Sequence, residues 1–249
     1  MINYIQVMDA YNSYLSGVVA LANLRRYVDS FGVRLGEAGV VNAVKDKRVV
    51  KELLGMNFVI QQPSLPDIIS TLKETEGQGK DKDDISKVLA FLEAEFAERW
   101  ELTLNPGEAY LEEEEKWKPF LNKKGEFSYT YGERLNGEVE QLAGLIDRLS
   151  EPSNHKSRHF YLSVWDRAKD FQNIAEGDRV PCTIGYNIRI QNKVLVVHHL
   201  MRSLDVDNWP RDYYLTYHLA KGLKECAELK EMSIQLIFTA GSLHRFYEV

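Results

Sequence analysis

Cys182 is the candidate nucleophile of this sequence. It stands in the segment RVPCTIGYNIRIQNKVLVVHHLMRS (179–203), directly after a proline and at the start of an alternating apolar run. A cysteine attacks as its thiolate, and a free thiol with a pKa of about 8.5 is mostly protonated at neutral pH, so this chemistry requires a nearby cation. Arg202 lies 20 residues later, where an antiparallel return would bring it back beside Cys182. Taken alone, the pattern favours a small buried cysteine that begins a strand.

Four segments of the second half have the composition and alternation of β-strands and would position these two residues. Asn192 and Lys193 stand between two of the segments and predict a hairpin turn. A helix is expected over 210–231, because a proline falls in its first turn and an apolar face follows, with Cys226 packed in the core. The predicted strands cover residues 157–165, 183–190, 193–201 and 232–240.

The first half predicts fewer elements. Apolar residues at helical spacing predict helices over 9–30 and 83–100, and residues 51–63 predict a strand near a sheet edge that stops at a proline. Residues 74–84 predict a polar loop, and the glutamate run within 110–120 is typical of a solvated face. Because no repeat or linker divides the chain, we expect a single α/β domain over 1–249.

Composition and charge exclude several classes of protein. The 249 residues are 44% hydrophobic and 27% charged, as in an ordinary globular protein, and a formal net charge of -6 argues against binding along a nucleic-acid polymer. We expect no membrane segment, no secretion signal and a cytoplasmic location. Two cysteines 44 positions apart cannot form a disulfide framework or a four-ligand zinc site, so we expect free thiols and no metal centre.

Several motifs together resemble the thymidylate synthase superfamily, in particular its archaeal-type branch and the deoxycytidylate hydroxymethylases. They are VPC at 180–182, MRS with an aspartate two residues further on (201–205), GEFSYTYGERL at 125–135 and GSLHRF at 241–246. The resemblance runs from about residue 45 to the end. It implies an α/β (α+β) fold with a large, mixed, twisted sheet and flanking helices, two copies of which pack their sheets back to back in a homodimer.

The resemblance also assigns the nucleotide side of a site. Cys182 matches the nucleophile, and SRH at 157–159 resembles a motif whose arginines reach the phosphate held by the partner subunit. For a further phosphate arginine near the N-terminus, Arg48 is chosen, with Lys45 and Lys47 as alternatives. The implied nucleotide ligands are Arg202 and Ser203 at the phosphate, His244 at the sugar 3′-hydroxyl, and Arg158 across the dimer.

On the folate side, the spacing of the family's motifs matches three further residues. Trp117 corresponds to the tryptophan that contacts the folate, Tyr131, 14 residues later, to the tyrosine that handles protons, and Glu95, 22 residues before Trp117, to the catalytic glutamate. Glu98 is the alternative for that last role. Asp205 matches the aspartate that orients the folate, so the implied co-substrate is 5,10-methylenetetrahydrofolate.

Asp212 stands where the archaeal-type thymidylate synthases carry an asparagine that reads uracil. Cytosine presents a donor at position 4 and an acceptor at N3, the reverse of uracil, and a carboxyl group suits this pattern better. The alternative is that Asp212 merely belongs to the first turn of its helix, where acidic residues are common. Thr183 after the nucleophile also matches the hydroxymethylases, whereas Phe246 replaces a family tyrosine that helps to hold the sugar.

The resemblance therefore implies folate-dependent hydroxymethylation at C5 of a cytidine monophosphate, with dCMP preferred and CMP possible. The chain ends five residues after His244, before the segment that closes over the folate in thymidylate synthases, and we expect a site that admits water. Two alternatives stay open. One is reductive methylation of dUMP, and the other is a nucleotide-binding homologue without catalysis.

Overall fold

A six-stranded sheet is the framework of the molecule. The computed structural model describes residues 16–35, 49–76, 125 and 128–247, and its strands lie in the order β1-β2-β6-β5-β4-β3. β5 and β6 run parallel and the other neighbours antiparallel, so the sheet is mixed as expected. The strands are β1 (Val33–Leu35), β2 (Val49–Gln61), β3 (Tyr161–Ser163), β4 (Thr183–Gln191), β5 (Val194–Asp205) and β6 (Ser233–Tyr247).

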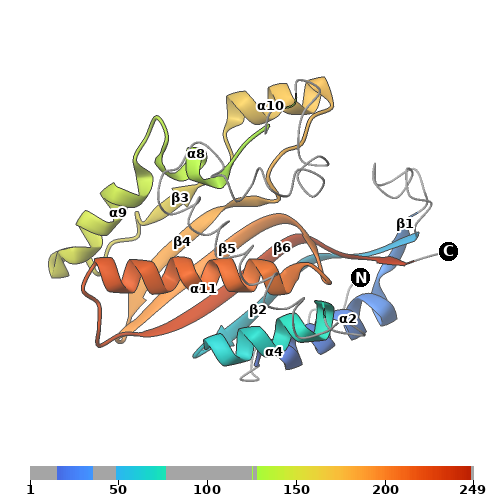
Figure 1. Cartoon of the computed structure of the whole chain (residues 1–249), viewed down its shortest axis with the longest axis horizontal. Helices are drawn as coiled ribbons and strands as arrows, with labels where there is room; N and C mark the ends of the chain where they lie inside the picture. The colour runs from blue at the N-terminus through green and yellow to red at the C-terminus, as the bar shows by residue number, and fades with distance from the viewer. Residues whose placement is uncertain (1–15, 36–48, 77–124, 126–127, 248–249) are drawn as a thin grey trace.

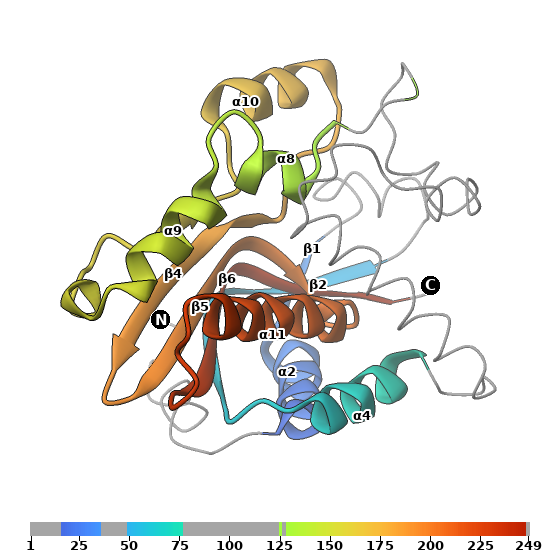
Figure 2. The same ribbon diagram turned by 60° about the vertical axis from the view of Figure 1, so that its left-hand side comes forward.

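Helices cover one face of this sheet. Helix α11 lies along its middle, with α2 and α4 on one side and α9 on the other (Figure 1). Helices α2, α4 and α11 contact one another, and the view in Figure 2 shows them on the same side of the sheet. The helices are α2 (Gly17–Phe31), α4 (Leu65–Glu76), α8 (Tyr131–Asn136), α9 (Gln141–Ser150), α10 (Arg167–Glu176) and α11 (Trp209–Cys226), with a 3-10 turn η3 (Pro152–Asn154).

The core lies between α11 and the strands β5 and β6. Trp209 and Tyr213 in the first turns of α11 stack at 5.3 Å, and Phe238 of β6 meets both rings edge-on. All three side chains are fully buried. At roughly 25 cal/mol per Å² of apolar surface removed from water, such side chains stabilise the fold by about 2 to 3 kcal/mol each. This aromatic cluster fixes the start of α11 against the sheet.

A tight turn joins β4 and β5 as predicted. Asn192 and Lys193 have φ angles of 49° and 62°, the two positive values that a type I′ hairpin requires. Gln191 and Val194 pair across this turn. The opposite end of the hairpin is irregular, because the register of β4 against β5 shifts at Thr183, directly after Cys182.

The sheet bends along a line that crosses β6 and β5. Successive side chains of a strand point to opposite faces, so residues three apart should face opposite ways. In β6, however, Ala240 and Leu243 are both buried in the core, and in β5 the same holds for Met201 and Leu204. Both strands therefore exchange their buried and exposed faces between these positions.

Two glycines permit this bend. Gly55 of β2 has a φ of 69°, which residues with a Cβ rarely adopt, and its two neighbours pair with the residues on either side of Gly241. A Cβ on Gly241 of β6 would lie 3.0 Å from the carbonyl oxygen of Arg202 in β5. The close approach of β5 and β6 at Arg202 thus depends on the missing side chain.

Several predicted boundaries differ from the structure. The strand predicted to end at 240 continues to Tyr247, because β6 pairs with β2 on one side along its length and with β5 on the other. The strand predicted over 157–165 is limited to Tyr161–Ser163, since the N–H groups of Val164 and Trp165 both donate to Ile184 and the ladder ends there. Cys226 is exposed at the end of α11, so the prediction of core packing was wrong.

The remaining predictions are confirmed in part or fall outside the described residues. The predicted ranges 210–231 and 9–30 overlap α11 and α2, and 51–63 overlaps β2. Residues 74–76 belong to α4 rather than to a loop, and the helix predicted over 83–100 lies outside the described residues. The described helices include none long and apolar enough to cross a bilayer.

Candidate active site

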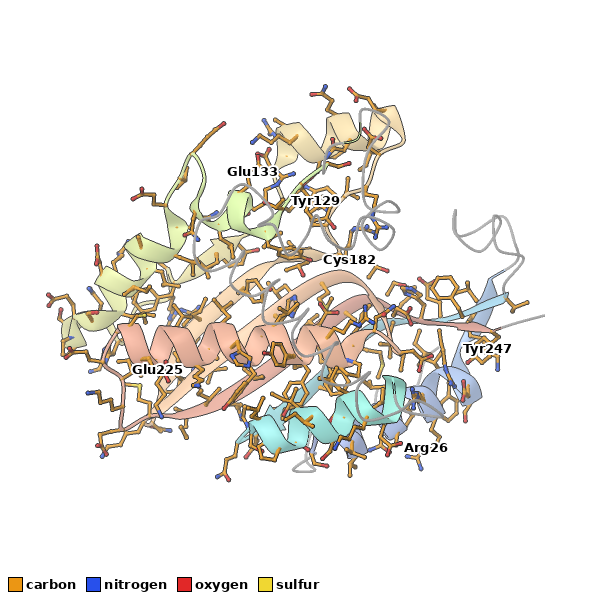
Figure 3. All side chains as sticks on the ribbon, in the orientation of Figure 1. Arg26, Tyr129, Glu133, Cys182, Glu225 and Tyr247 are labelled. Carbon is orange, nitrogen blue, oxygen red and sulfur yellow. The ribbon has the colours of Figure 1, made fainter. Side chains whose placement is uncertain are left out.

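Cys182 and Arg202 meet at the start of β4. The backbone N–H of Arg202 donates to the carbonyl of Cys182 at 2.8 Å. The Arg202 guanidinium lies along the residues that precede Cys182. Its Nε donates to the Pro181 carbonyl at 3.0 Å, and a terminal nitrogen donates to the Val180 carbonyl at 3.3 Å. The hairpin therefore brings the predicted cation beside the predicted nucleophile, and Figure 3 shows Cys182 between the strands and the segment that leads into α8.

Burial and the nearby charges shift the pKa of the Cys182 thiol in different directions. Burial raises the pKa of Cys182 and is the largest effect, while the positive charges of Arg202 and Arg179 lower it. The negative charges of Asp212 and Asp205 raise the pKa further. Burial and the two carboxylates therefore disfavour the thiolate, and a change that neutralises these carboxylates would favour it.

Tyr131 is brought to the same place from a distant part of the chain. It is the first residue of α8, whose N-cap Thr130 accepts a hydrogen bond from the Glu133 N–H at 3.1 Å. The Tyr131 hydroxyl donates to Thr183 Oγ1 at 3.1 Å. The structure therefore brings the predicted proton-handling group to the residue next to the predicted nucleophile, since Thr183 follows Cys182 directly.

A buried ion pair fixes the helix that carries Tyr131. Arg134 of α8 donates to Asp170 Oδ1 of α10 at 2.7 Å, and both side chains are buried. The other oxygen of Asp170 accepts from the Asp166 N–H at 2.8 Å. On the surface, Lys169 pairs with Glu133 at 2.7 Å. Helix α8 is therefore anchored on α10 rather than on the central sheet alone.

Ser203 and His244 form the next part of the site. Ser203 Oγ lies 3.3 Å from His244 Nδ1, across the parallel strands β5 and β6. Burial lowers the pKa of His244, and the nearby carboxylates Asp205 and Glu52 act in the opposite direction. The Phe246 ring stands edge-on to the imidazole at 5.3 Å. A neutral, half-buried imidazole beside a hydroxyl is suited to hydrogen bonding with a sugar hydroxyl.

Asp205 lies at the end of β5 and shapes the turn into α11. One carboxylate oxygen accepts from the Asp207 N–H at 3.1 Å and the other accepts from Asn208 Nδ2 at 2.7 Å. Burial raises the pKa of Asp205, whereas His244 lowers it. The carboxylate thus has a role in the turn whether or not it also contacts a ligand.

Asp212 lies in the first turn of α11, where a negative charge also suits the helix dipole. Its charge is felt at Cys182, and its carbonyl accepts a hydrogen bond of 2.6 Å from Thr216 Oγ1. The position is therefore compatible with both interpretations made from the sequence, since the carboxylate is part of the helix start and also of the surroundings of the thiol.

The overall fold matches a known solved structure. Thermostable thymidylate synthase A from Bacillus subtilis superposes with a TM-score of 0.58 at 15% sequence identity, over 91% of this chain and 78% of that chain. The chain has the thymidylate synthase fold. Comparison with protein-family models gives no match, and neither does comparison with curated protein sequences. At this level of identity the likeness establishes the fold alone.

Within this thymidylate synthase fold, four of the residues assigned from the sequence fall outside the site or the described residues. Arg189, seven residues along β4 from Cys182, donates to the Ser157 carbonyl at 3.0 Å. At about 3.3 Å per residue, this puts the neighbouring Arg158 roughly 20 Å from Cys182 in the same chain. Glu95, Trp117 and Arg48 lie outside the described residues.

His199 belongs to the site although the sequence analysis did not select it. Its ring is 1% exposed and lies 2.8 Å from Thr183 Oγ1 and 2.9 Å from Thr216 Oγ1. A signal was present in the sequence, because alternation along VLVVHHLM puts His199 on the same face as Leu195 and Val197. A polar residue on the apolar face of a strand requires buried hydrogen-bond partners, and here the partners are part of the site.

Proposed function

We propose that the protein transfers a one-carbon unit from 5,10-methylenetetrahydrofolate to C5 of a cytidine monophosphate as a hydroxymethyl group, with dCMP preferred over CMP. The observation that carries this proposal is the 3.1 Å contact between the Tyr131 hydroxyl and Thr183, which joins a proton-handling group to the residue next to Cys182. It occurs in a chain with the thymidylate synthase fold, with Arg202 at hydrogen-bond distance from the segment that ends in Cys182.

The nucleotide phosphate is held by Arg202 and Ser203 in this proposal, and the sugar 3′-hydroxyl by His244. Arg158 lies before β3, next to Ser157, which contacts Arg189 toward the far end of β4 from Cys182, so we propose that it serves the site of a second copy in a back-to-back homodimer. Arg48 would complete the phosphate ligands. Guanidinium groups suit this task because they bind phosphate oxygens through paired hydrogen bonds.

Asp212 reads the base. A carboxyl group that shares one proton with cytosine N3 accepts from the 4-amino group with its other oxygen, a pattern that uracil cannot complete. Neutralising this carboxylate also removes one of the charges that raise the pKa of Cys182. Binding of the correct base would thereby favour the thiolate at the moment when it is needed.

The first chemical step makes C5 nucleophilic. The Cys182 thiolate adds to C6, the electrons of the C5–C6 double bond move toward C4, and N3 takes the proton that it shares with Asp212. C5 then attacks the methylene carbon of the folate as the bond from that carbon to N10 breaks and N10 takes a proton, and the proton on N3 returns to Asp212. We propose that Glu95, or Glu98, moves protons at the folate, while Trp117 and Asp205 hold it.

The second step removes the C5 hydrogen. Tyr131 accepts this proton through a water molecule, the C–H electron pair forms the exocyclic double bond, and N5 of the folate departs. Water then adds to the exocyclic methylene, and the displaced electrons expel the Cys182 thiolate from C6. The overall reaction consumes one water and yields the 5-hydroxymethyl nucleotide and tetrahydrofolate.

One experiment tests the proposal against its two alternatives. The purified protein is incubated with methylenetetrahydrofolate and dCMP, CMP or dUMP that carries tritium at C5, tritium release to water is followed, and the product mass is measured. We expect release from dCMP, weaker release from CMP, and a product heavier by one CH₂O unit. Cys182→Ala is the control and should release none.

The outcomes separate the candidates. Release from dUMP alone, with a methylated product, would replace the proposal by reductive methylation. No release from any nucleotide would favour a binding protein without catalysis, an alternative supported by the raised pKa of the Cys182 thiol and by Phe246 in place of the family tyrosine.

A further inference from the structure

A row of four hydrogen bonds leads from Tyr131 through the interior of the protein to the start of α11. Tyr131 donates to Thr183 Oγ1 at 3.1 Å, and Thr183 Oγ1 lies 2.8 Å from His199 Nε2. The other ring nitrogen, Nδ1, lies 2.9 Å from Thr216 Oγ1, which donates to the carbonyl of Asp212 at 2.6 Å. The row connects residues from α8, β4, β5 and α11.

The middle of this row is closed to solvent. Thr183 and Thr216 are fully buried and His199 is 1% exposed. The imidazole lies between aromatic rings, with centroid distances of 4.6 Å to Tyr186 and 5.7 Å to Phe238. A buried imidazole in an apolar setting needs partners for both nitrogens, and the two threonine hydroxyls supply them.

The direction of the hydrogen bonds is fixed from one end. A carbonyl oxygen can only accept, so the single Thr216 hydroxyl proton points to Asp212. Thr216 must then accept from His199, which puts a proton on Nδ1, and in a neutral ring Nε2 is then the acceptor. Thr183 consequently donates to Nε2 and accepts from Tyr131, so all four bonds point the same way.

We propose that His199 is the proton acceptor behind Tyr131 and acts on the substrate only through Thr183 and Tyr131. This inference rests on the proposed function. When a proton from C5 reaches the Tyr131 oxygen, the hydroxyl proton of Tyr131 moves to Thr183 and that of Thr183 moves to His199 Nε2. The result is an imidazolium, so the charge is stored inside the protein and no phenolate is required. The proton returns by the reverse path after the product departs.

A relay explains why this buried position holds a histidine. A purely structural role requires only that the threonine hydroxyls be satisfied. A relay also requires one group in the row that can take up a second proton for a short time, and imidazole can do so, because Nε2 accepts a proton while Nδ1 keeps its own. His199 is a positioning residue in this sense, since it orients the hydroxyls on both sides and takes up the proton that arrives through them.

The first test uses the protein without any ligand. Nitrogen-15 NMR of the histidine side chains should show His199 as a neutral ring with the proton on Nδ1. Thr183→Val keeps the branched shape but removes the donor, and it should shift the Nε2 resonance of His199. A wild-type ring with its proton on Nε2 would overturn the relay, whatever the activity of the protein.

The second test separates proton removal from the steps before it. Thr183→Val and His199→Phe should slow tritium release from C5 of dCMP by about 100-fold or more in a single turnover. Thr183→Ser keeps the hydroxyl and should restore release to within about fivefold of wild type. 5-Fluoro-dCMP isolates the earlier steps, because with the folate it forms the adduct on Cys182 but cannot lose fluorine as a cation. Thr183→Val and His199→Phe should both form this adduct at nearly the wild-type rate.

His198 provides the matched control. It neighbours His199 on β5, bonds to Thr239 of β6 at 2.6 Å, and alternation puts it on the opposite face of the sheet. His198→Phe should leave tritium release unchanged.

Equal losses of adduct formation and tritium release in Thr183→Val would overturn the relay in favour of a structural role. An absence of release from every nucleotide in the wild type would instead overturn the proposed function, while the ring tautomer is still measured by NMR.

Discussion

The backbone N–H of Arg202 donates a 2.8 Å hydrogen bond to the carbonyl oxygen of Cys182, and this bond sets the register of the hairpin at its open end. Because the guanidinium then folds against Pro181 and Val180, its positive charge stays beside the thiol. The arrangement links a local backbone contact to the reactivity of a side chain.

Arg202→Met should make Cys182 less reactive. Removing the positive charge destabilises the thiolate, so the pKa of Cys182 rises further above its ordinary value. We expect alkylation by iodoacetamide near pH 7.5 to slow by about two- to tenfold. The measurement is best made in a Cys226→Ser background, because Cys226 is exposed and would react first.

Arg189→Met is the control for this charge effect. Arg189 belongs to the same strand as Thr183 but lies at its far end, where it donates to the Ser157 carbonyl. The variant removes the same charge from the protein and should leave the alkylation rate of Cys182 unchanged. An equal slowing in both variants would attribute the effect to net charge rather than to the position of Arg202.

Asp212→Asn should change the thiol in the opposite direction. The negative charge of Asp212 raises the pKa of Cys182, so its loss lowers that pKa and accelerates alkylation. The same variant should weaken binding of dCMP relative to dUMP by about ten- to a hundredfold, because an unpaired buried polar group costs about 1 to 3 kcal/mol. Calorimetric titration with both nucleotides measures this ratio. An unchanged ratio together with faster alkylation would restrict Asp212 to an electrostatic role.

Asp170→Ala should destabilise the protein strongly. It removes the carboxylate that pairs with the buried Arg134 at 2.7 Å and leaves that guanidinium only the partly exposed Asp166, at 3.3 Å. We expect a loss that approaches the cost of an uncompensated buried charge, about 3 to 5 kcal/mol. Urea unfolding measures the loss. Glu138→Ala is the comparison, since its side chain is 90% exposed and lies 3.9 Å from Lys169, and we expect a change below about 0.5 kcal/mol. A loss of similar size in both variants would contradict the importance of the buried pair.

The sequence predicts the second half of the fold better than the first for a physical reason. Strands β4 and β5 alternate clearly and are joined by Asn192 and Lys193, so local propensity and tertiary pairing agree. Residues 241–247 mix polar and apolar side chains without regular alternation, and their strand depends on pairing with β2 and β5. Helix α8 is too short for a periodic pattern and depends on its Thr130 cap and the buried Arg134.

The sequence predicted that Arg202 lies beside Cys182, because both residues belong to one hairpin and their spacing determines where its two strands bring them together. The contact of Tyr131 with Thr183 joins residues 52 positions apart, and only the resemblance to a family pointed to it. Alternation along β5 could have indicated that His199 is buried, but its partners Thr183 and Thr216 come from other elements, and no local pattern identifies them.

Protonation of His218 on unfolding should account for part of the loss of stability at acid pH. It lies in α11 with its ring 4.3 Å from that of Tyr214, and burial lowers its pKa to about 4. In the unfolded chain the pKa returns to about 6.5, so below that pH the unfolded state binds a proton that the folded state does not. The free energy of unfolding therefore falls as pH decreases from about 6.5 to 4, by about 1 to 2 kcal/mol after allowance for partial exposure.

His218→Phe keeps the ring against Tyr214 but cannot titrate, so urea unfolding at several pH values should show a shallower loss of stability between pH 6.5 and 4. The loss should not vanish, because burial also lowers the pKa of His198 and His244. His159→Phe is the matched control, since His159 is exposed before β3 and its replacement should leave the acid limb as in the wild type. An acid limb of wild-type slope in His218→Phe would show that the proton uptake on unfolding occurs elsewhere in the chain.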